Sequence, residues 1–444
     1  MNTRHLSGAA LAVLASLSAA NAAAQTLCPL SEELRLLEDR AAPYTLDAAL
    51  AAIRDASPEV QSAALEAVAR RYEAQQASLW TNPVVSVEAE NFYGDAFGSA
   101  NPLSGYDFAE TTVSIGQTFR LGGKRRLERR AALARTALAE ADRDATLRAL
   151  QREAAAIFYE LAAAQEGAQL AAEAARLSNE LADAVRARVD AGKSPRTALD
   201  RAIAAQADAR AAAAASAAQA EQLAYALGSF WGRRDPVEIA GASLFAPTVL
   251  PSAELVANQV ETHPERRLAD ARRDARLAER RAARAQANPD VTASLGVRRF
   301  EADGTEALVA GVSLPLPLFD RNQGNIRAAS TRARGAAYEA DVTAARLAAS
   351  AQRSLSTAAI LETRRAALVD DALPAARRAA EAARTGYRAG KFDLTTALAA
   401  QTSLITVQRS AITAAFAARD AEAEVRALAA LPPFSPSFCQ ETDR

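Results

Sequence analysis

The residues of this 444-residue chain whose types could do chemistry are carboxylates placed shortly before two glycine turns. Asp183 and Glu381 are equivalent, because they are as far apart in the sequence as Gly192 and Gly390 are. Asp190 lies nearest the first turn. Carboxylates gathered at a constriction would favour cations. The alternative is a solvated helix face on which these acids pair with nearby arginines. Those arginines are Arg186, Arg188 and Arg384.

Other reactive groups are scarce. His263, directly before Pro264, is the one histidine left after the leader, and no spaced His, Cys and carboxylate cluster could hold a metal. The triplet Gly192-Lys193-Ser194 resembles the end of a phosphate-binding loop, but the glycine required five residues earlier is an alanine. No nucleophile elbow is present. We therefore expect no enzyme activity, no cofactor and no bound metal.

Residues 1–24 resemble a secretory signal peptide with a short positive start, an apolar run and a small-residue cleavage site. We expect cleavage before Gln25. The mature chain has two cysteines, Cys28 and Cys439, and export places them in an oxidising compartment. They either form one disulfide that ties the termini together or remain two free thiols.

The charges nearly cancel, since 52 basic residues face 53 acidic ones. This balance gives no reason to expect a nucleic-acid partner. Half of the residues are hydrophobic but only 5% are aromatic, and alanine is abundant, which is typical of long helices packed through small side chains. No stretch after the leader reaches the ~18–20 apolar residues of a spanning helix.

The same order of elements occurs twice. Pro58 and Pro83 of the first copy return 206 residues later as Pro264 and Pro289. Duplication favours two interwoven halves of one body over separate domains. The expected segments are a signal peptide (1–24), an N-terminal extension (25–44), a first repeat (45–231), a linker (232–251), a second repeat (252–431) and a C-terminal tail (432–444).

Each repeat contains a predicted β-hairpin, over 84–119 and 290–319. In the first, residues 111–119 alternate between an apolar and a polar face, and the last strand of the second ends near Leu318 with Pro315 and Pro317 on its opposite face. This pattern is typical of a membrane β-barrel, although a soluble two-sheet core alternates in the same way. Four strands cannot close a barrel, and lipid does not tolerate open edges. A barrel would therefore be shared between protomers.

Long helices follow the hairpins. The segments 123–190 and 195–231 form one predicted helix hairpin, and 324–389 and 394–431 form the other. At 1.5 Å per residue the first long helix would be roughly 100 Å long. Pro374 should kink the outgoing helix of the second pair.

This duplicated plan resembles the TolC-type outer-membrane efflux protein family over essentially the whole mature chain. The segment Asn82-Pro83-Val84-Val85-Ser86-Val87-Glu88, and Leu121-Gly122-Gly123-Lys124-Arg125 after the hairpin, are similar to the branch serving cobalt, zinc and cadmium resistance pumps. Around the second glycine turn, Tyr387-Arg388-Ala389-Gly390-Lys391 fits the family's tip pattern, whereas the first copy has Val189 in place of Tyr387.

The resemblance implies a mainly α fold with a twelve-stranded barrel in a homotrimer, placed in the outer membrane of a Gram-negative bacterium and extending into the periplasm. It also implies a passive duct docked, through its helix tips, to a periplasmic adaptor and a proton-driven inner-membrane transporter. The docking residues would be Gly192, Lys193, Ser194, Gly390, Lys391 and Phe392. The exported substrate would be divalent metal cations, or alternatively organic toxicants. The alternative from a different functional class is a soluble periplasmic coiled-coil scaffold or adaptor.

A basic run follows the first hairpin, comprising Lys124, Arg125, Arg126, Arg129 and Arg130. Positive charge at a helix start opposes the helix dipole, so a partner is expected. The run either contacts the headgroups of outer-membrane lipid or is a solvated cluster.

Overall fold

The computed structural model describes residues 43–91, 109–240, 243–389, 391–392 and 394–429. From Tyr44 onward the chain forms one compact unit. The predicted signal peptide, Cys28, Cys439 and the C-terminal tail lie outside the described residues, as does Gly390.

The first repeat consists of α2 (Leu46–Ala56), α3 (Pro58–Gln76), α4 (Lys124–Asp190) and α5 (Arg196–Ser229). The hydroxyl of Thr45 caps α2 by accepting a hydrogen bond from the Ala48 N–H at 3.2 Å, and Pro58 occupies the first turn of α3. With 67 residues, α4 is about 100 Å long. It packs against α3, α5, α7 and α10, so one helix aligns most of the others.

The second repeat consists of α6 (Ala253–Val260), α7 (Pro264–Ala285), α8 (Gln323–Ala366), α9 (Leu373–Arg388) and α10 (Leu394–Leu428). A π-helical turn, Ala367–Ala372, separates α8 from α9. The sequence predicts one helix kinked at Pro374, and the irregular turn lies immediately before that proline. Proline has no N–H and its ring crowds the preceding turn, which accounts for the widened turn there.

The four strands form one antiparallel sheet in the order β1 (Val84–Glu90), β2 (Glu110–Phe119), β3 (Val291–Phe300) and β4 (Glu306–Ser313). The two hairpins join through β2 and β3, where Ile115 pairs with Leu295. The predicted end of the last strand near Leu318 is wrong, because β4 ends at Ser313. Pro315 and Pro317 have no N–H to donate and lie beyond the strand.

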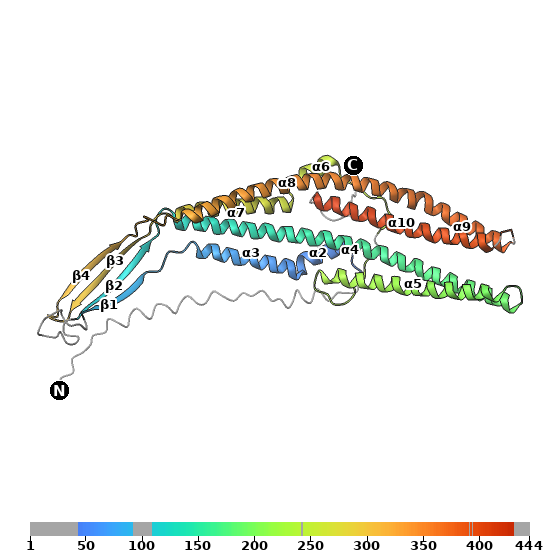
Figure 1. Cartoon of the computed structure of the whole chain (residues 1–444), viewed down its shortest axis with the longest axis horizontal. Helices are drawn as coiled ribbons and strands as arrows, with labels where there is room; N and C mark the ends of the chain where they lie inside the picture. The colour runs from blue at the N-terminus through green and yellow to red at the C-terminus, as the bar shows by residue number, and fades with distance from the viewer. Residues whose placement is uncertain (1–42, 92–108, 241–242, 390, 393, 430–444) are drawn as a thin grey trace, which may run out of the picture. The chain divides into compact units, whose positions relative to one another are not determined.

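Figure 1 shows the four strands at one end of the helices and the turns of both helix hairpins at the other. This arrangement follows from the chain order, because the strands interrupt α3–α4 and α7–α8, whereas the glycine turns interrupt α4–α5 and α9–α10. None of the helices within the described residues is both long and apolar enough to cross a membrane.

Each repeat has its own core midway along the helices. The first gathers Ile53 of α2, Phe158 and Leu161 of α4, and Leu227 of α5. The second gathers side chains of α6, α8 and α10. Its fully or nearly buried members include Val256, Leu347, Ala358 and Val425. The short helices α2 and α6 therefore have the same role in the two repeats, which the 206-residue repeat predicts.

Two buried arginines hold the linker between α5 and α6. Arg365 of α8 donates to the Phe245 carbonyl at 3.0 Å, and Arg419 of α10 donates to the carbonyls of Ser243 at 2.8 Å and Ala246 at 2.7 Å. We call residues 243–249 the strap. It joins the two repeats, and these bonds fix it to two helices of the second repeat.

Each of these arginines is paired with a glutamate three residues away that also binds the strap. Glu362 pairs with Arg365 at 2.9 Å and accepts the Thr248 N–H, while Glu422 pairs with Arg419 at 2.8 Å and accepts the Val249 N–H. Glu422 is only 1% exposed. Breaking a buried pair leaves an uncompensated charge, which makes the Arg419–Glu422 pair costly to break. Arg365 has a second carboxylate partner, Asp370, at 3.0 Å.

We predict that Glu422→Gln destabilises the protein by about 3–5 kcal/mol, since it removes the buried carboxylate that pairs with Arg419 and Arg426. A lower thermal midpoint, followed by circular dichroism at the helix band, measures this. Glu173→Gln is the matched control, because Glu173 and Arg176 form an exposed pair at the same spacing and its loss should cost at most about 1 kcal/mol. Equal shifts of the thermal midpoint in the two variants would show that the buried pair at the strap stabilises the protein no more than an exposed pair does.

Candidate functional site

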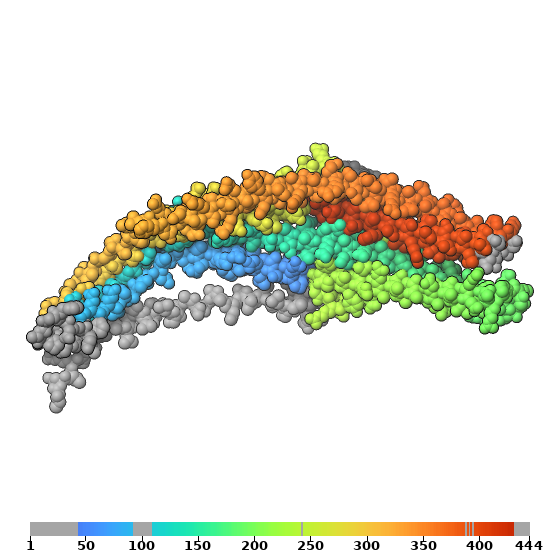
Figure 2. Space-filling view, viewed as in Figure 1, coloured from blue at the N-terminus to red at the C-terminus, as the bar shows by residue number. Residues whose placement is uncertain are grey.

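The sheet has one apolar face that is exposed in the single chain. Val85 of β1, Ile115 of β2 and Leu295 of β3 lie in one row across it, and Val87, Val113, Val297 and Leu308 form the next row. Val85 is 67% exposed and Val312 of β4 is 78% exposed. In Figure 2 no described helix covers the strands on the face in view. A continuous apolar face of this kind requires a partner surface or a lipid environment.

The opposite face is polar and includes a charged cluster. Arg298 of β3 contacts Glu110 of β2 at 2.8 Å and Glu90 of β1 at 3.2 Å, and it donates to the Thr112 hydroxyl at 3.0 Å. On the same face, the next row toward the helices consists of small residues, namely Ser86, Ser114 and Gly296. A face of this composition suits contact with water.

The edges of the sheet are unpaired within the chain. β1 pairs only with β2, and β4 pairs only with β3, in the part of the chain that the structure describes. Each edge strand therefore has a row of outward N–H and C=O groups. Such groups cost several kcal/mol each in lipid, so a membrane-embedded sheet needs further strands at both edges.

The first helix tip is closed by a Schellman motif. Lys193 donates its N–H to the Arg188 carbonyl at 2.8 Å, and Gly192 donates to Val189 at 2.9 Å. Gly192 has a φ of +70°, a conformation that favours glycine. At the surface of this tip, Arg188 donates to the Ser194 hydroxyl at 3.3 Å.

The second tip repeats the backbone bond but not the side chains. Lys391 donates its N–H to the Gly386 carbonyl at 2.8 Å. This bond is equivalent to that from Lys193 to Arg188, because both residues are shifted by 198 positions, as Gly390 is from Gly192. The ring of Phe392 packs where a Cβ on Gly386 would lie, within 2.3 Å of that position. The tips thus share a turn but present different surfaces: an arginine and a serine in the first, an exposed phenylalanine in the second.

The candidate acids are all exposed, and two of them form equivalent ion pairs. Asp183 pairs with Arg186 at 2.8 Å, and Glu381 pairs with Arg384. Asp190 ends α4 at the first tip. In the single chain the structure does not bring the three acids together, because they lie on two different helix hairpins.

Glu381 and Arg384 line a groove between α4, α9 and α10. Its volume is about 380 Å³, and its other charged members are Glu173 and Arg377. Two glutamates therefore face two arginines across this groove. Such a balanced set can form ion pairs along the helix surface, and it does not resemble a cation-binding cluster.

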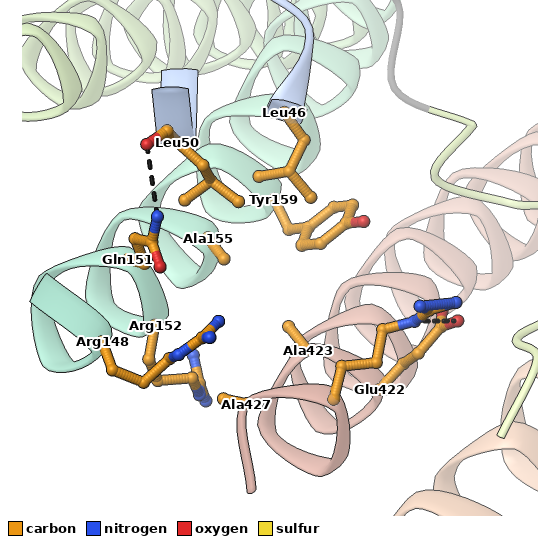
Figure 3. Close-up of a pocket in the computed structure, with 11 residues that line it drawn as sticks. Leu46, Leu50, Arg148, Gln151, Arg152, Ala155, Tyr159, Glu422, Ala423 and Ala427 are labelled. Carbon is orange, nitrogen blue, oxygen red and sulfur yellow. Dashed lines mark hydrogen bonds and ion pairs between the residues drawn. The ribbon is translucent and has the colours of Figure 1, made fainter. Parts of the chain in front are cut away.

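A small cavity lies midway along the helices, between α2, α4 and α10 (Figure 3). Its volume is about 40 Å³, which leaves room for little more than a water molecule. Burial raises the pKa of Tyr159 in its wall to about 12, so that hydroxyl stays neutral. The cavity has no nucleophile next to a base and cannot admit a substrate.

His263 is a structural residue in this fold. It is 5% exposed, its Nδ1 accepts the Glu265 N–H at 3.2 Å and it hydrogen-bonds the backbone of Ala427. Burial lowers the pKa of His263, which favours the neutral ring that caps α7. Among the described residues no three His, Cys, Asp or Glu side chains gather closely enough to hold a metal ion.

Two polar groupings that matter for this architecture were not predicted from the sequence. One is the pair of strap contacts from Arg365 and Arg419, and the other is the Arg298 cluster across three strands. Both join residues far apart in the chain, so spacing alone gives no signal for them. The helix faces carrying Glu362–Arg365 and Glu422–Arg419 look like ordinary ion pairs at a three-residue spacing.

Comparison with known proteins gives matches in both repeats. The family model described as outer membrane efflux protein matches residues 49–233 and 257–431. A cobalt-zinc-cadmium resistance protein, CzcC of Cupriavidus metallidurans, is 30% identical over 372 residues, covering 82% of this chain and 85% of that protein. The nickel and cobalt resistance protein CnrC of the same organism is 32% identical over 300 residues, covering 67% and 69%.

Solved structures share the fold. The outer membrane protein VceC of Vibrio cholerae aligns with a TM-score of 0.69 at 20% identity, covering 87% of this chain and 97% of that one. The family match spans the duplicated unit in both halves, including the hairpins, the long helices and the tips. The chain therefore belongs to the outer membrane efflux protein family.

Proposed function

We propose that this protein is the outer-membrane channel of a tripartite efflux system. The observation that carries the proposal is the four-stranded sheet with one exposed apolar face, one polar face and two unpaired edges. Three copies supply twelve strands, which is enough to close a barrel with the apolar face toward lipid and the polar face toward water. The helices of the three copies then form a tunnel through the periplasm.

The substrates are divalent heavy-metal cations. Support comes from the resistance proteins to which the chain is similar, whose names specify cobalt, zinc, cadmium and nickel. The described residues offer no cluster of metal ligands, so ions pass in solution and are not held by the wall. Selection among metals then rests with the inner-membrane transporter.

The helix tips dock the periplasmic adaptor, which links the channel to a proton-driven inner-membrane transporter. The docking residues are Gly192, Lys193, Ser194, Gly390, Lys391 and Phe392. Their unequal surfaces support two different contacts per protomer, since Arg188 and Ser194 are polar whereas Phe392 is apolar and exposed.

Asp183, Asp190 and Glu381 form rings at the periplasmic constriction of the trimer. Their positions one to three turns before the tips support this role. In the single chain, Asp183 and Glu381 each pair with an arginine three residues further along the same helix. A carboxylate freed from its arginine raises the local concentration of cations.

Deleting the gene in its own host should lower the concentrations of cobalt, zinc or cadmium that stop growth, with restoration by the plasmid-borne wild type. The reason is that no outward path remains for ions already captured by the transporter. Organic toxicants are tested in parallel as the control. Unchanged metal tolerance with lowered tolerance to organic toxicants would contradict the metal assignment and favour the organic one.

Asp183→Asn/Glu381→Gln should reduce the cation preference of single channels in planar bilayers. The variant removes two equivalent carboxylates, one from each helix hairpin. Reversal potential in a potassium chloride gradient measures the preference. Asp200→Asn is the control, since it removes an exposed acid near the first tip on the return helix α5. A double variant with the reversal potential and gating of the wild type would rule out the ring.

A further inference from the structure

Positive charge is concentrated where the helices meet the sheet. We call residues 76–83, 120–135, 276–290 and 315–329 the basic belt. They contain thirteen arginines and lysines against four carboxylates, in a chain whose total charge is −1. The excess at this level is therefore offset elsewhere along the molecule.

Contacts between the helices place these four segments at one level. Lys124 Nζ lies 2.7 Å from Asp290, and Arg135 of α4 lies 2.8 Å from Glu279 of α7. Asn322, before α8, donates to the Ala283 carbonyl at 2.7 Å. The Thr81 hydroxyl donates to the Thr118 carbonyl at 2.9 Å, which adds the end of the α3 segment.

The next level of the same four helices has no such excess. Residues 64–75, 136–147, 267–275 and 330–338 contain eight basic and seven acidic side chains. Many of them pair, as Arg71 does with Glu140 at 2.9 Å. The surplus is thus confined to the level beside the sheet and is not a general property of arginine-rich helices.

The carboxylates of the belt are already in use. Glu128 pairs with Arg120, Glu279 with Arg135 and Arg276, and Asp290 with Lys124. Asp320 accepts the Asn322 N–H at 2.8 Å. Seven exposed arginines pair with no carboxylate in the part of the chain that the structure describes. They are Arg126, Arg129, Arg130, Arg281, Arg284, Arg321 and Arg327.

Local helix energetics disfavour part of this arrangement. α4 begins with Lys124, Arg125 and Arg126, and neither α4 nor α8 has an acid in its first turn. Cations at a helix N-terminus are destabilising by a few tenths of a kcal/mol or more each. A compensating anion from outside the chain removes this cost.

The belt also contains exposed apolar side chains. Leu318 and Phe319 lie just before α8, and Phe319 is 91% exposed. Trp80, which is 62% exposed, carries the guanidinium of Arg125 at 4.0 Å from its ring centroid. Aromatic residues beside a row of cations, at the end of an apolar face, are the pattern of a membrane interface.

We propose that the basic belt binds the anionic phosphate headgroups of phospholipids in the periplasm-facing leaflet of the membrane, with Trp80 seated at the acyl boundary. This inference rests on the proposed channel. Rotational symmetry places the basic belt of each protomer beside the basic belt of its neighbour. The neighbour therefore has the same surplus of arginines and cannot neutralise the positive charge. The lipid supplies the missing anions, because arginine forms paired hydrogen bonds to phosphate. The belt then fixes the height of the sheet in the bilayer.

Trp80 provides the test, since its fluorescence reports which lipids surround the belt. The mature protein is reconstituted in equal mixtures of phosphatidylglycerol and phosphatidylcholine, with bromine quenchers on one lipid or the other. Trp80→Phe protein gives the signal of the buried Trp231 for subtraction. We expect brominated phosphatidylglycerol to quench Trp80 with roughly fivefold local enrichment.

Arg126→Gln/Arg129→Gln/Arg130→Gln should bring the enrichment close to onefold. Arg332→Gln/Arg334→Gln/Arg346→Gln, three exposed arginines of α8 outside the belt, should leave it unchanged. Equal quenching by both lipids in the wild type, or enrichment that survives the belt substitutions, would overturn the inference. Loss of enrichment on adding inorganic phosphate, but not chloride at equal ionic strength, would assign the belt to free phosphate and also overturn it. If neither lipid quenched Trp80, the chain would not be in the bilayer, and the proposed channel itself would fail.

Discussion

The four-stranded sheet, with its open edges and exposed apolar face, is the constraint on which the rest of the structure depends. Among the described residues, β1 and β4 each pair on one side only, and the apolar rows through Val85 and Val113 are exposed. The exposed rows are unfavourable in water. The unpaired edges of a single copy are unfavourable in lipid, because unpaired backbone groups cannot reach water there. The same strands have a polar second face, crossed by the Arg298 cluster, which suits a water-filled interior. In the proposed channel, the sheet is therefore completed by strands from other copies of the chain. The helices must then be arranged so that several copies fit around one axis.

The helices transmit that arrangement to the far end of the molecule. α4 runs from the sheet to the first tip in 67 residues and packs on helices of both repeats. Midway, Arg365 and Arg419 fasten the strap to α8 and α10, and Arg152 of α4 pairs with Asp420 of α10 at 3.0 Å, which joins the two repeats. Between the two helix hairpins, α4 packs against α10 among the described residues, and α9 joins them in lining one groove nearer the tips.

Local patterns were enough to predict most elements. The period-two alternation over 111–119 gave the strand and its faces, Pro58 marked the start of α3, and the glycine turn gave the end of α4 at Asp190. The last strand was predicted too long, because its apolar alternation continues to Leu318 while the ladder cannot continue through Pro315 and Pro317.

Features that depend on long-range contacts could not be read from the sequence. The carbonyl that Arg365 binds is 120 residues away, and Phe392 lies over Gly386 only because the turn closes. The full extent of the basic belt likewise appears only when Lys124 is found beside Asp290. Before that, its arginines are three separate groups in the sequence, in 120–135, 276–290 and 315–329. Asp183 and Asp190 lie in α4 and Glu381 lies in α9, and the ring that they would form in a trimer stays a prediction.

Cross-linking of the two sheet edges tests the central claim most directly. Ser86→Cys/Val309→Cys, in a Cys28→Ser/Cys439→Ser background, places one thiol on β1 and one on β4. Within a chain these strands are three spacings apart, about 14 Å, so a shorter thiol cross-linker applied to intact membranes cannot join them. The shared barrel predicts covalent dimers and trimers and nothing larger. Monomers alone, or an open-ended ladder of higher oligomers, would contradict it.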